Sequence, residues 1–106
     1  MTDKIIILTT WPDPAGAKAL AEALVTRRLA ACINVLPEMT SIYAWQGKLE
    51  QGAEHQLIIK TRRHRQDEVT ALIVERHPYE LPEILCIPVT AGLPGYLDWI
   101  DEATHE

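Results

Sequence analysis

The sequence predicts an α+β fold in which a β-α-β-β-α-β series forms an antiparallel sheet and a short helix follows at the C-terminus. Two apolar runs, 4–10 and 56–61, have the unbroken hydrophobic character of strands buried on both faces. Two segments with apolar residues at helical spacing, 14–29 and 65–76, lie between strands. This order of elements is the split βαβ or ferredoxin-like arrangement, with both helices on one face of the sheet.

Prolines predict which strands lie at the sheet edges. The other two strands are expected over 32–45 and 83–89, and these segments contain Pro37 and Pro88. Because proline has no N–H to donate to a ladder, both strands belong at edges, which gives the strand order 4-1-3-2. The segment 32–45 is more than twice the usual strand length of about 5–6 residues, so we expect a bend or bulge near Pro37. Residues 49–55 form either a short extension or an irregular crossing.

Local signals define the helices. Asp13 is expected to be the N-cap of the first helix, and Pro14 occupies the first helical position, where its missing N–H costs nothing. The second helix has no clear side-chain cap, but Asp67 and Glu68 lie in its first turn, where the helix dipole favours negative charge. A short amphipathic C-terminal helix is predicted by Leu93, Tyr96, Leu97 and Ile100.

Composition indicates one globular domain over residues 1–106, with 47% hydrophobic residues. A net charge of −5 and a pI near 5.3 argue against a nucleic-acid partner, because phosphate binding needs clustered positive charge. The basic run 60–65 is a local exception, which we interpret as a solvated loop between strand and helix or, alternatively, as an anion site.

The N-terminal apolar run and the cysteines indicate the cellular compartment. The apolar run 5–8 is too short for a signal segment or a membrane span, so we expect a cytoplasmic protein without a membrane partner. Cys32 and Cys86 lie far apart without a CxxC pair, so neither a disulfide framework nor a zinc ribbon is indicated. Both thiols are expected to be reduced.

Residues 77–84, His-Pro-Tyr-Glu-Leu-Pro-Glu-Ile, form a rigid polar segment that we call the elbow. Each of its prolines restricts the preceding residue, so the helix before it must end near Arg76. An imidazole, a phenol and two carboxylates are thereby held in a fixed bend. A functional site in this segment is one hypothesis, and a purely structural turn is the other.

Five segments together resemble the CutA divalent-cation tolerance family, and the resemblance covers about residues 5–100. They are 30–34 (AACIN), 40–48 (TSIYAWQGK), 77–84 (HPYELPEI), 88–92 (PVTAG) and 96–99 (YLDW). The resemblance implies a ferredoxin-like subunit, similar to the PII signalling proteins, that assembles into a homotrimer through its edge strands. It also implies a role in tolerance of metal ions, chiefly copper, without catalysis.

In that family, copper ligands have been proposed at a cysteine ending the first strand and at two adjacent histidines before the elbow. Here Thr9 stands at the cysteine position and Arg76-His77 replaces the histidine pair. One imidazole cannot form a copper site alone. The predicted metal ligands are therefore His77, Cys32 and Glu83. For each we also consider a structural role: His77 as a cap on the preceding helix, Cys32 as a small buried side chain, and Glu83 as an acceptor of backbone N–H groups.

A second set of residues is predicted to line a cleft between subunits: Tyr43, Trp45, Lys60, Tyr79 and Glu80. Simple packing of the trimer is the alternative, because Trp and Tyr are enriched at interfaces. The first functional hypothesis is a homotrimeric protein that binds copper or another divalent ion. The second is a PII-like regulatory module that senses a small anionic ligand in the cleft. An enzyme using Cys32 or Glu83 has no supporting motif, so neither catalysis nor an organic cofactor is expected.

Overall fold

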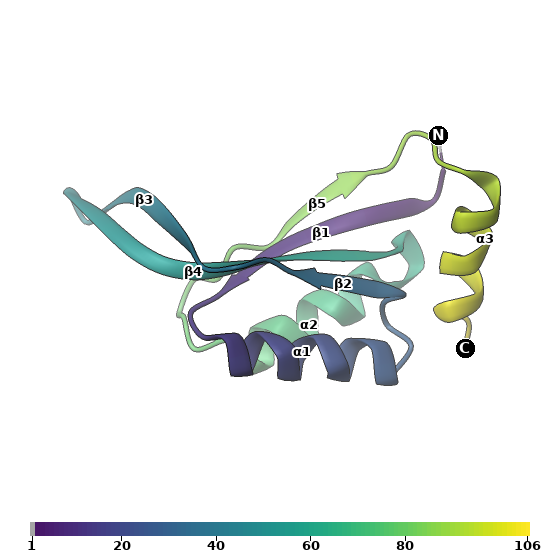
Figure 1. The fold of residues 1–106 in the computed structure, drawn as a ribbon, viewed down its shortest axis with the longest axis horizontal. Coiled ribbons are helices and arrows are strands. Elements are labelled where there is room, and N and C mark those ends of the chain that lie inside the picture. The colour runs from purple at the N-terminus through teal and green to yellow at the C-terminus, as the bar shows by residue number, and fades with distance from the viewer. Residues whose placement is uncertain (1) are drawn as a thin grey trace.

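A computed structural model describes residues 2–106, and its elements follow the predicted order (Figure 1). The strands are β1 (Lys4–Trp11), β2 (Cys32–Val35), β3 (Met39–Trp45), β4 (Lys48–Arg62) and β5 (Leu85–Pro88). The helices are α1 (Pro14–Thr26), α2 (Gln66–Arg76) and α3 (Pro94–Ala103), with a 3₁₀ turn over Arg63–Arg65. In Figure 1, α1 and α2 lie against one face of the sheet, and α3 lies at the end of the sheet near the N-terminus.

The strand order of the main sheet is β2-β4-β1-β5, with every pairing antiparallel. This confirms the order predicted from the prolines, with β2 and β5 at the edges. Pro88 lies in β5 as expected, and its register partner on β1 is Ile5.

The predicted strand 32–45 is two strands, which corrects its expected continuity. Residues 36–38 leave the sheet, so Pro37 lies in the break between β2 and β3 and not in a strand. β3 then pairs with the outer part of β4, from Met39 opposite Glu54 to Trp45 opposite Lys48. Residues 49–55 are accordingly a regular extension of β4. β3 and the outer half of β4 form a hairpin that projects beyond the main sheet (Figure 1).

Alternation along the strands gives the sheet two different faces. Ile5 and Ile7 point toward the helices with Leu57 and Ile59, and all four are almost completely buried. On the opposite face Ile6, Leu8 and Ile58 are half-buried, while Leu85 and Ile87 on β5 are 55% and 42% exposed. We call this second surface the open face, since α1 and α2 both lie on the other side. The open face is therefore apolar but uncovered within one chain.

The first helix begins as the sequence predicts. The Asp13 carboxylate accepts a hydrogen bond of 2.7 Å from the Gly16 N–H, and Pro14 follows as the first helical residue. The side chains of Ala17, Leu20 and Leu24 are buried against the sheet. No helix within residues 2–106 has the length and apolar character needed to cross a membrane.

The basic run 60–65 is a solvated connection only in part: Arg63 and His64 are exposed in the 3₁₀ turn, while Thr61 and Arg65 are buried. Its first three residues belong to β4, and Arg65 is only 5% exposed. The Arg65 Nε donates to the Thr104 carbonyl (3.0 Å), and the Arg62 Nη2 donates to the same carbonyl (3.1 Å). From the far side, Arg28 donates to the carbonyls of Glu102 and His105. The three guanidinium groups thus bind the C-terminal end of α3, where the helix dipole favours positive charge.

Thr9 gives a test of the packing of the core. Its side chain is completely buried on the face of Ile5 and Ile7, and its Oγ1 has no hydrogen-bond partner among residues 2–106. Thr9→Val removes this unpaired hydroxyl with little change of shape, so we expect the free energy of unfolding to be unchanged or raised by about 1 kcal/mol.

Thr61→Val is the matched control for this prediction. Thr61 is equally buried on a neighbouring strand, but its Oγ1 donates to the Leu29 carbonyl at 2.7 Å. Removing that donor leaves a buried carbonyl unsatisfied, which should cost about 1–3 kcal/mol. Urea unfolding at one protein concentration compares the two variants. An equal loss of stability in both would contradict the assignment of Thr9.

Candidate functional site

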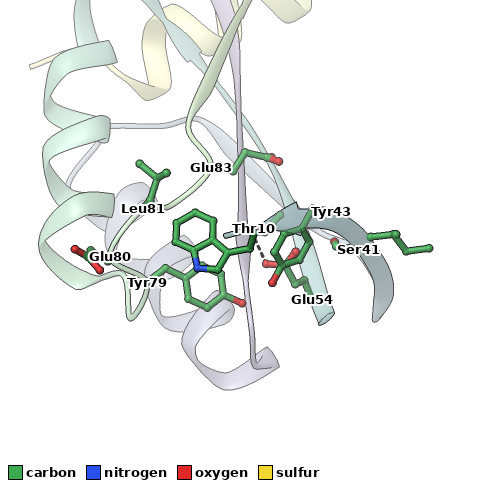
Figure 2. A pocket seen from close by; sticks show the side chains of 10 residues that line it. Thr10, Ser41, Tyr43, Glu54, Tyr79, Glu80, Leu81 and Glu83 are labelled. Atoms are coloured by element: carbon green, nitrogen blue, oxygen red, sulfur yellow. Dashed lines mark hydrogen bonds between the residues drawn. The ribbon is translucent and has the colours of Figure 1, made fainter. Parts of the chain in front are cut away.

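A pocket of about 600 Å³ lies between the hairpin and the elbow, and Figure 2 shows it from close by. β1 and β4 contribute Thr10 and Glu54 to its floor, and β3 and the elbow form its walls. Its complete lining is Thr10, Ser41, Ile42, Tyr43, Trp45, Glu54, Tyr79, Glu80, Leu81 and Glu83.

Glu54 is an acidic group of the pocket whose carboxylate is fixed by hydrogen bonding. Its Oε2 accepts a hydrogen bond of 2.9 Å from the Thr10 hydroxyl, and the hydroxyls of Ser41 and Tyr79 lie close enough to the carboxylate to favour its charged form. Burial alone would raise the pKa of Glu54, but the hydroxyls of Ser41, Thr10 and Tyr79, together with nearby His77, outweigh it, so that the pKa is lowered from its ordinary value. Glu54 is therefore an anion at neutral pH.

Tyr79 extends from the elbow toward Glu54, and Figure 2 shows its hydroxyl directed at that carboxylate. Burial raises the pKa of Tyr79 to about 12, with further contributions from the Glu54 charge, the hydrogen bond to Glu54 and nearby Tyr43. The phenol consequently remains protonated and acts as a donor. It links the elbow to the outer part of β4.

His77 is buried at the start of the elbow, and both of its ring nitrogens are occupied. The Tyr79 N–H donates to Nδ1 (3.0 Å), and a backbone amide can only donate, so Nδ1 is the unprotonated nitrogen. Nε2 then carries the hydrogen and donates to the Thr10 carbonyl (2.7 Å). The ring also packs between Trp11 and Tyr79, with centroids 4.4 and 4.7 Å away.

The role of His77 at the end of α2 differs from the expected cationic cap. Its backbone N–H donates to the Ile73 carbonyl (2.8 Å), which closes the last turn of the helix. Its ring, however, is directed to β1 and not to the helix carbonyls. A metal could use this imidazole only after one of the two ring hydrogen bonds has broken.

The three predicted metal ligands do not meet within one chain. Cys32 is opposite Lys60 on β4, while Glu83 accepts a hydrogen bond of 3.0 Å from Gln56. Lys60 and Gln56 are four residues apart on one strand, which corresponds to roughly 13 Å. Across residues 2–106, no three His, Cys, Asp or Glu side chains are grouped so that they could hold a metal ion.

Four of the five predicted cleft residues line the pocket: Tyr43, Trp45, Tyr79 and Glu80. Lys60 is not among them, since its Nζ lies 6.0 Å from the centre of the Tyr96 ring at the other end of β4. Sequence reasoning missed Glu54, Thr10 and Ser41. Reading residues 48–55 as a strand would have placed Glu54 on the face of Gln56 and suggested its role.

Fold and pocket define a small α+β protein with an antiparallel sheet, helices on one of its faces and a polar cavity at its margin. The chain belongs to the CutA1 divalent ion tolerance protein family, whose model matches residues 5–103. The divalent-cation tolerance protein CutA of Pectobacterium atrosepticum is 43% identical over 101 residues, covering 95% of this chain and 92% of that protein.

Two other proteins extend the comparison. The CutA homologue of Xenopus laevis is 44% identical over 92% of this chain, which spans 64% of that protein's length. The crystal structure of CutA from Xylella fastidiosa superimposes with a TM-score of 0.94 at 41% identity, covering 97% of this chain and 99% of that one. The α+β fold is thus shared with solved CutA structures.

The Tyr79–Glu54 contact predicts unusual behaviour at alkaline pH. The pKa of Tyr79 is raised from 10.0 to about 12, so the stability that its hydroxyl contributes is complete below pH 10 and is lost as the pH rises toward about 12. In an ultraviolet titration whose absorbances are read after rapid pH jumps, one tyrosine should therefore ionise only at a pH well above 10. Tyr79→Phe should remove this high-pH transition, and Tyr96→Phe should retain it. A high-pH transition that persists in Tyr79→Phe would refute the contact.

Proposed function

We propose that this protein acts in divalent-cation tolerance as a homotrimer that binds the ion where its subunits meet, without catalysing a reaction. One observation carries this proposal: the chain leaves an apolar sheet face uncovered, as an association surface does. An ion site where subunits meet on that face combines donors from more than one chain. Membership of the divalent ion tolerance family supports the same role.

Association is supported by the exposed apolar side chains. On the hairpin, Ile42 is 64% exposed, and Tyr43 and Trp45 are about half exposed. At the other margin, the edge strand β5 presents Leu85 and Ile87. An exposed sheet edge beside apolar side chains invites pairing with another chain. The family resemblance supports three as the number of subunits.

The proposed ion donors are Cys32, Glu83 and His77. Cys32 is a free, half-buried thiol beside the open face, and Glu83 lies at the rim of the pocket. Thiolate and imidazole suit copper better than they suit calcium or magnesium, so copper is the first ion to test. The proposed compartment is the cytoplasm, where free cysteines such as Cys32 and Cys86 persist.

A second candidate function is a regulatory module that senses a small ligand in the pocket. The four cleft residues that line the cavity favour it. Within one chain, Glu54, Glu80 and Glu83 line this pocket and no Lys, Arg or His does. An anionic ligand in a cleft between subunits would therefore need its positive partners from a neighbouring subunit.

The trimer predicts a mass in solution of three times the 11.9 kDa chain, measurable by light scattering after size exclusion. Ile87→Asp places a charge on the open face and should dissociate the protein into monomers. Val74→Asp is the matched control, since Val74 is 58% exposed on α2, on the opposite side of the sheet, and its variant should remain a trimer. A monomeric wild type at micromolar concentration would refute the proposal.

Ion binding is tested by calorimetric titration of the native assembly with Cu(II) and Zn(II), and with Cu(I) in competition with a chelator. Cys32→Ser and Glu83→Gln should each weaken copper binding by about tenfold or more, as loss of a ligand does. Cys86→Ser and Glu75→Gln are the matched controls and should bind copper like the wild type. If no ion binds, or if the controls lose as much affinity as the ligand variants, the proposed donor set is wrong.

A further inference from the structure

Glu54 carries a negative charge that has no ion-pair partner within one chain. Its carboxylate is half-buried, and the hydroxyls around it, among them that of Thr10, are neutral groups. No Lys, Arg or His lines the pocket, and Glu80 and Glu83 add further negative charge to the lining. Water can solvate such a group, but an anion that an association surface covers needs a positive partner.

The proposed trimer covers this pocket. Its floor, Thr10 and Glu54, lies on the same face of the sheet as Ile6 and Ile58, because side chains alternate along β1 and β4. Its walls on β3 belong to the hairpin, whose apolar side chains are exposed. Both surfaces are the ones by which the subunits are proposed to associate, so a neighbouring chain meets Glu54 in the assembly.

Lys60 is a cation that the open face presents to a neighbour. It lies opposite Ile6 on β1 and Cys32 on β2, and its side chain therefore belongs to the open face. Its Nζ lies 6.0 Å from the centre of the Tyr96 ring, and none of the ion pairs among residues 2–106 includes it. Its charge is therefore available for an ion pair with another chain.

The other cations of the open face are already engaged. Lys4 forms an ion pair with Asp101 at 2.9 Å, and the Arg62 guanidinium donates to the Thr104 carbonyl. The remaining Lys and Arg side chains lie on the helices, at their ends or beside the hairpin turn. Among the open-face cations of residues 2–106, Lys60 is thus the one without an anionic or carbonyl partner.

Lys60 cannot reach Glu54 of its own chain. The two residues are six apart on β4, which corresponds to roughly 20 Å along the strand. Glu54 lies toward the hairpin and Lys60 toward α3, and these two elements lie at opposite ends of the chain (Figure 1). A contact between opposite ends of one face is heterologous, and its repetition closes into a ring. A three-membered ring is the assembly proposed above.

We propose that the Lys60 side chain of one subunit enters the pocket of its neighbour and forms an ion pair with Glu54, its alkyl stem lying against Tyr43 and Trp45. The site is complete only where two chains meet. This inference rests on the proposed homotrimer and deepens it by naming the two ends that join. It also agrees with the proposed ion donors, because Cys32 lies opposite Lys60 and approaches the same neighbouring pocket, whose lining includes Glu83.

A double-mutant cycle tests the ion pair through the rate of subunit exchange, which native mass spectrometry follows between labelled and unlabelled trimers. Lys60→Gln and Glu54→Gln each leave one charge unpaired in the interface and should speed exchange about tenfold or more. The double variant should exchange about as fast as either single variant, because the second change removes a charge that is already unpaired.

Two control variants make the same chemical changes on the opposite side of the sheet. Lys18→Gln lies on an exposed face of α1 and Glu75→Gln on an exposed face of α2. Both should exchange subunits at the rate of the wild type.

A carbodiimide cross-link locates the contact. The reagent joins an amine to a carboxylate that touches it, so wild-type trimers should yield an amide between Lys60 and Glu54. In trimers assembled from labelled and unlabelled chains, some linked peptide pairs should carry one label of each kind, which shows that the link joins two chains. Lys60→Arg keeps the charge but offers no amine, so it should abolish the link and retain slow exchange.

The inference is overturned if the two glutamine variants have additive effects on exchange, if neither changes it, or if wild-type trimers yield no amide between Lys60 and Glu54. Such a result beside an intact trimer that binds copper removes only this inference. A wild type that is monomeric in light scattering removes the proposed homotrimer and this inference together.

Discussion

The length and alternation of β4 are the constraint on which the rest of the structure depends. Its inner part pairs with β1 and β2, and its outer part pairs with β3. Because successive side chains point to opposite faces, one strand supplies Leu57 and Ile59 to the helix-covered core and Ile58 to the open face. The same alternation continues outward to Glu54. A shift of one residue in register would move the core residues to the open face and remove Glu54 from the pocket.

The pocket exists because two segments meet that outer part of β4 from different directions. The hairpin turn returns β3 alongside it, and the elbow crosses from α2 toward β5 and brings Tyr79 to Glu54. His77 holds the elbow in place through β1, since its ring bridges the Thr10 carbonyl and the Tyr79 amide. His77 therefore positions the elbow and is not itself among the residues that line the pocket.

Much of the fold could be predicted from the sequence because its signals are local. Asp13 and Pro14 are adjacent, and together they mark the first turn of α1 by local geometry. Pro37 indicated an edge and a bend correctly, although the chain leaves the sheet there altogether. Residues 49–55 were ambiguous because Gly52 and several polar residues hide their alternation, and only pairing with β3 makes them a regular strand.

The candidate site was less predictable because its contacts are distant in sequence. Tyr43, Trp45, Tyr79 and Glu80 could be selected as exposed aromatic and polar groups beside rigid turns. Nothing in the sequence says that Thr10 donates to Glu54, 44 residues later, or that His77 faces Thr10 across 67 residues. Lys60 lies at the other end of β4 from this pocket, so its place in a cleft between subunits stays a prediction.

The hairpin has a thermodynamic consequence for whatever binds near it. Beyond Glu54 it is a two-stranded ribbon whose side chains are exposed or half-buried, and such ribbons are only marginally stable alone. Its local opening should require much less free energy than unfolding of the sheet beneath it. A ligand or neighbour that contacts Tyr43 or Trp45 therefore also shifts a folding equilibrium, and part of its binding energy is used to order the ribbon. Binding in the pocket and ordering of the hairpin are therefore thermodynamically coupled equilibria.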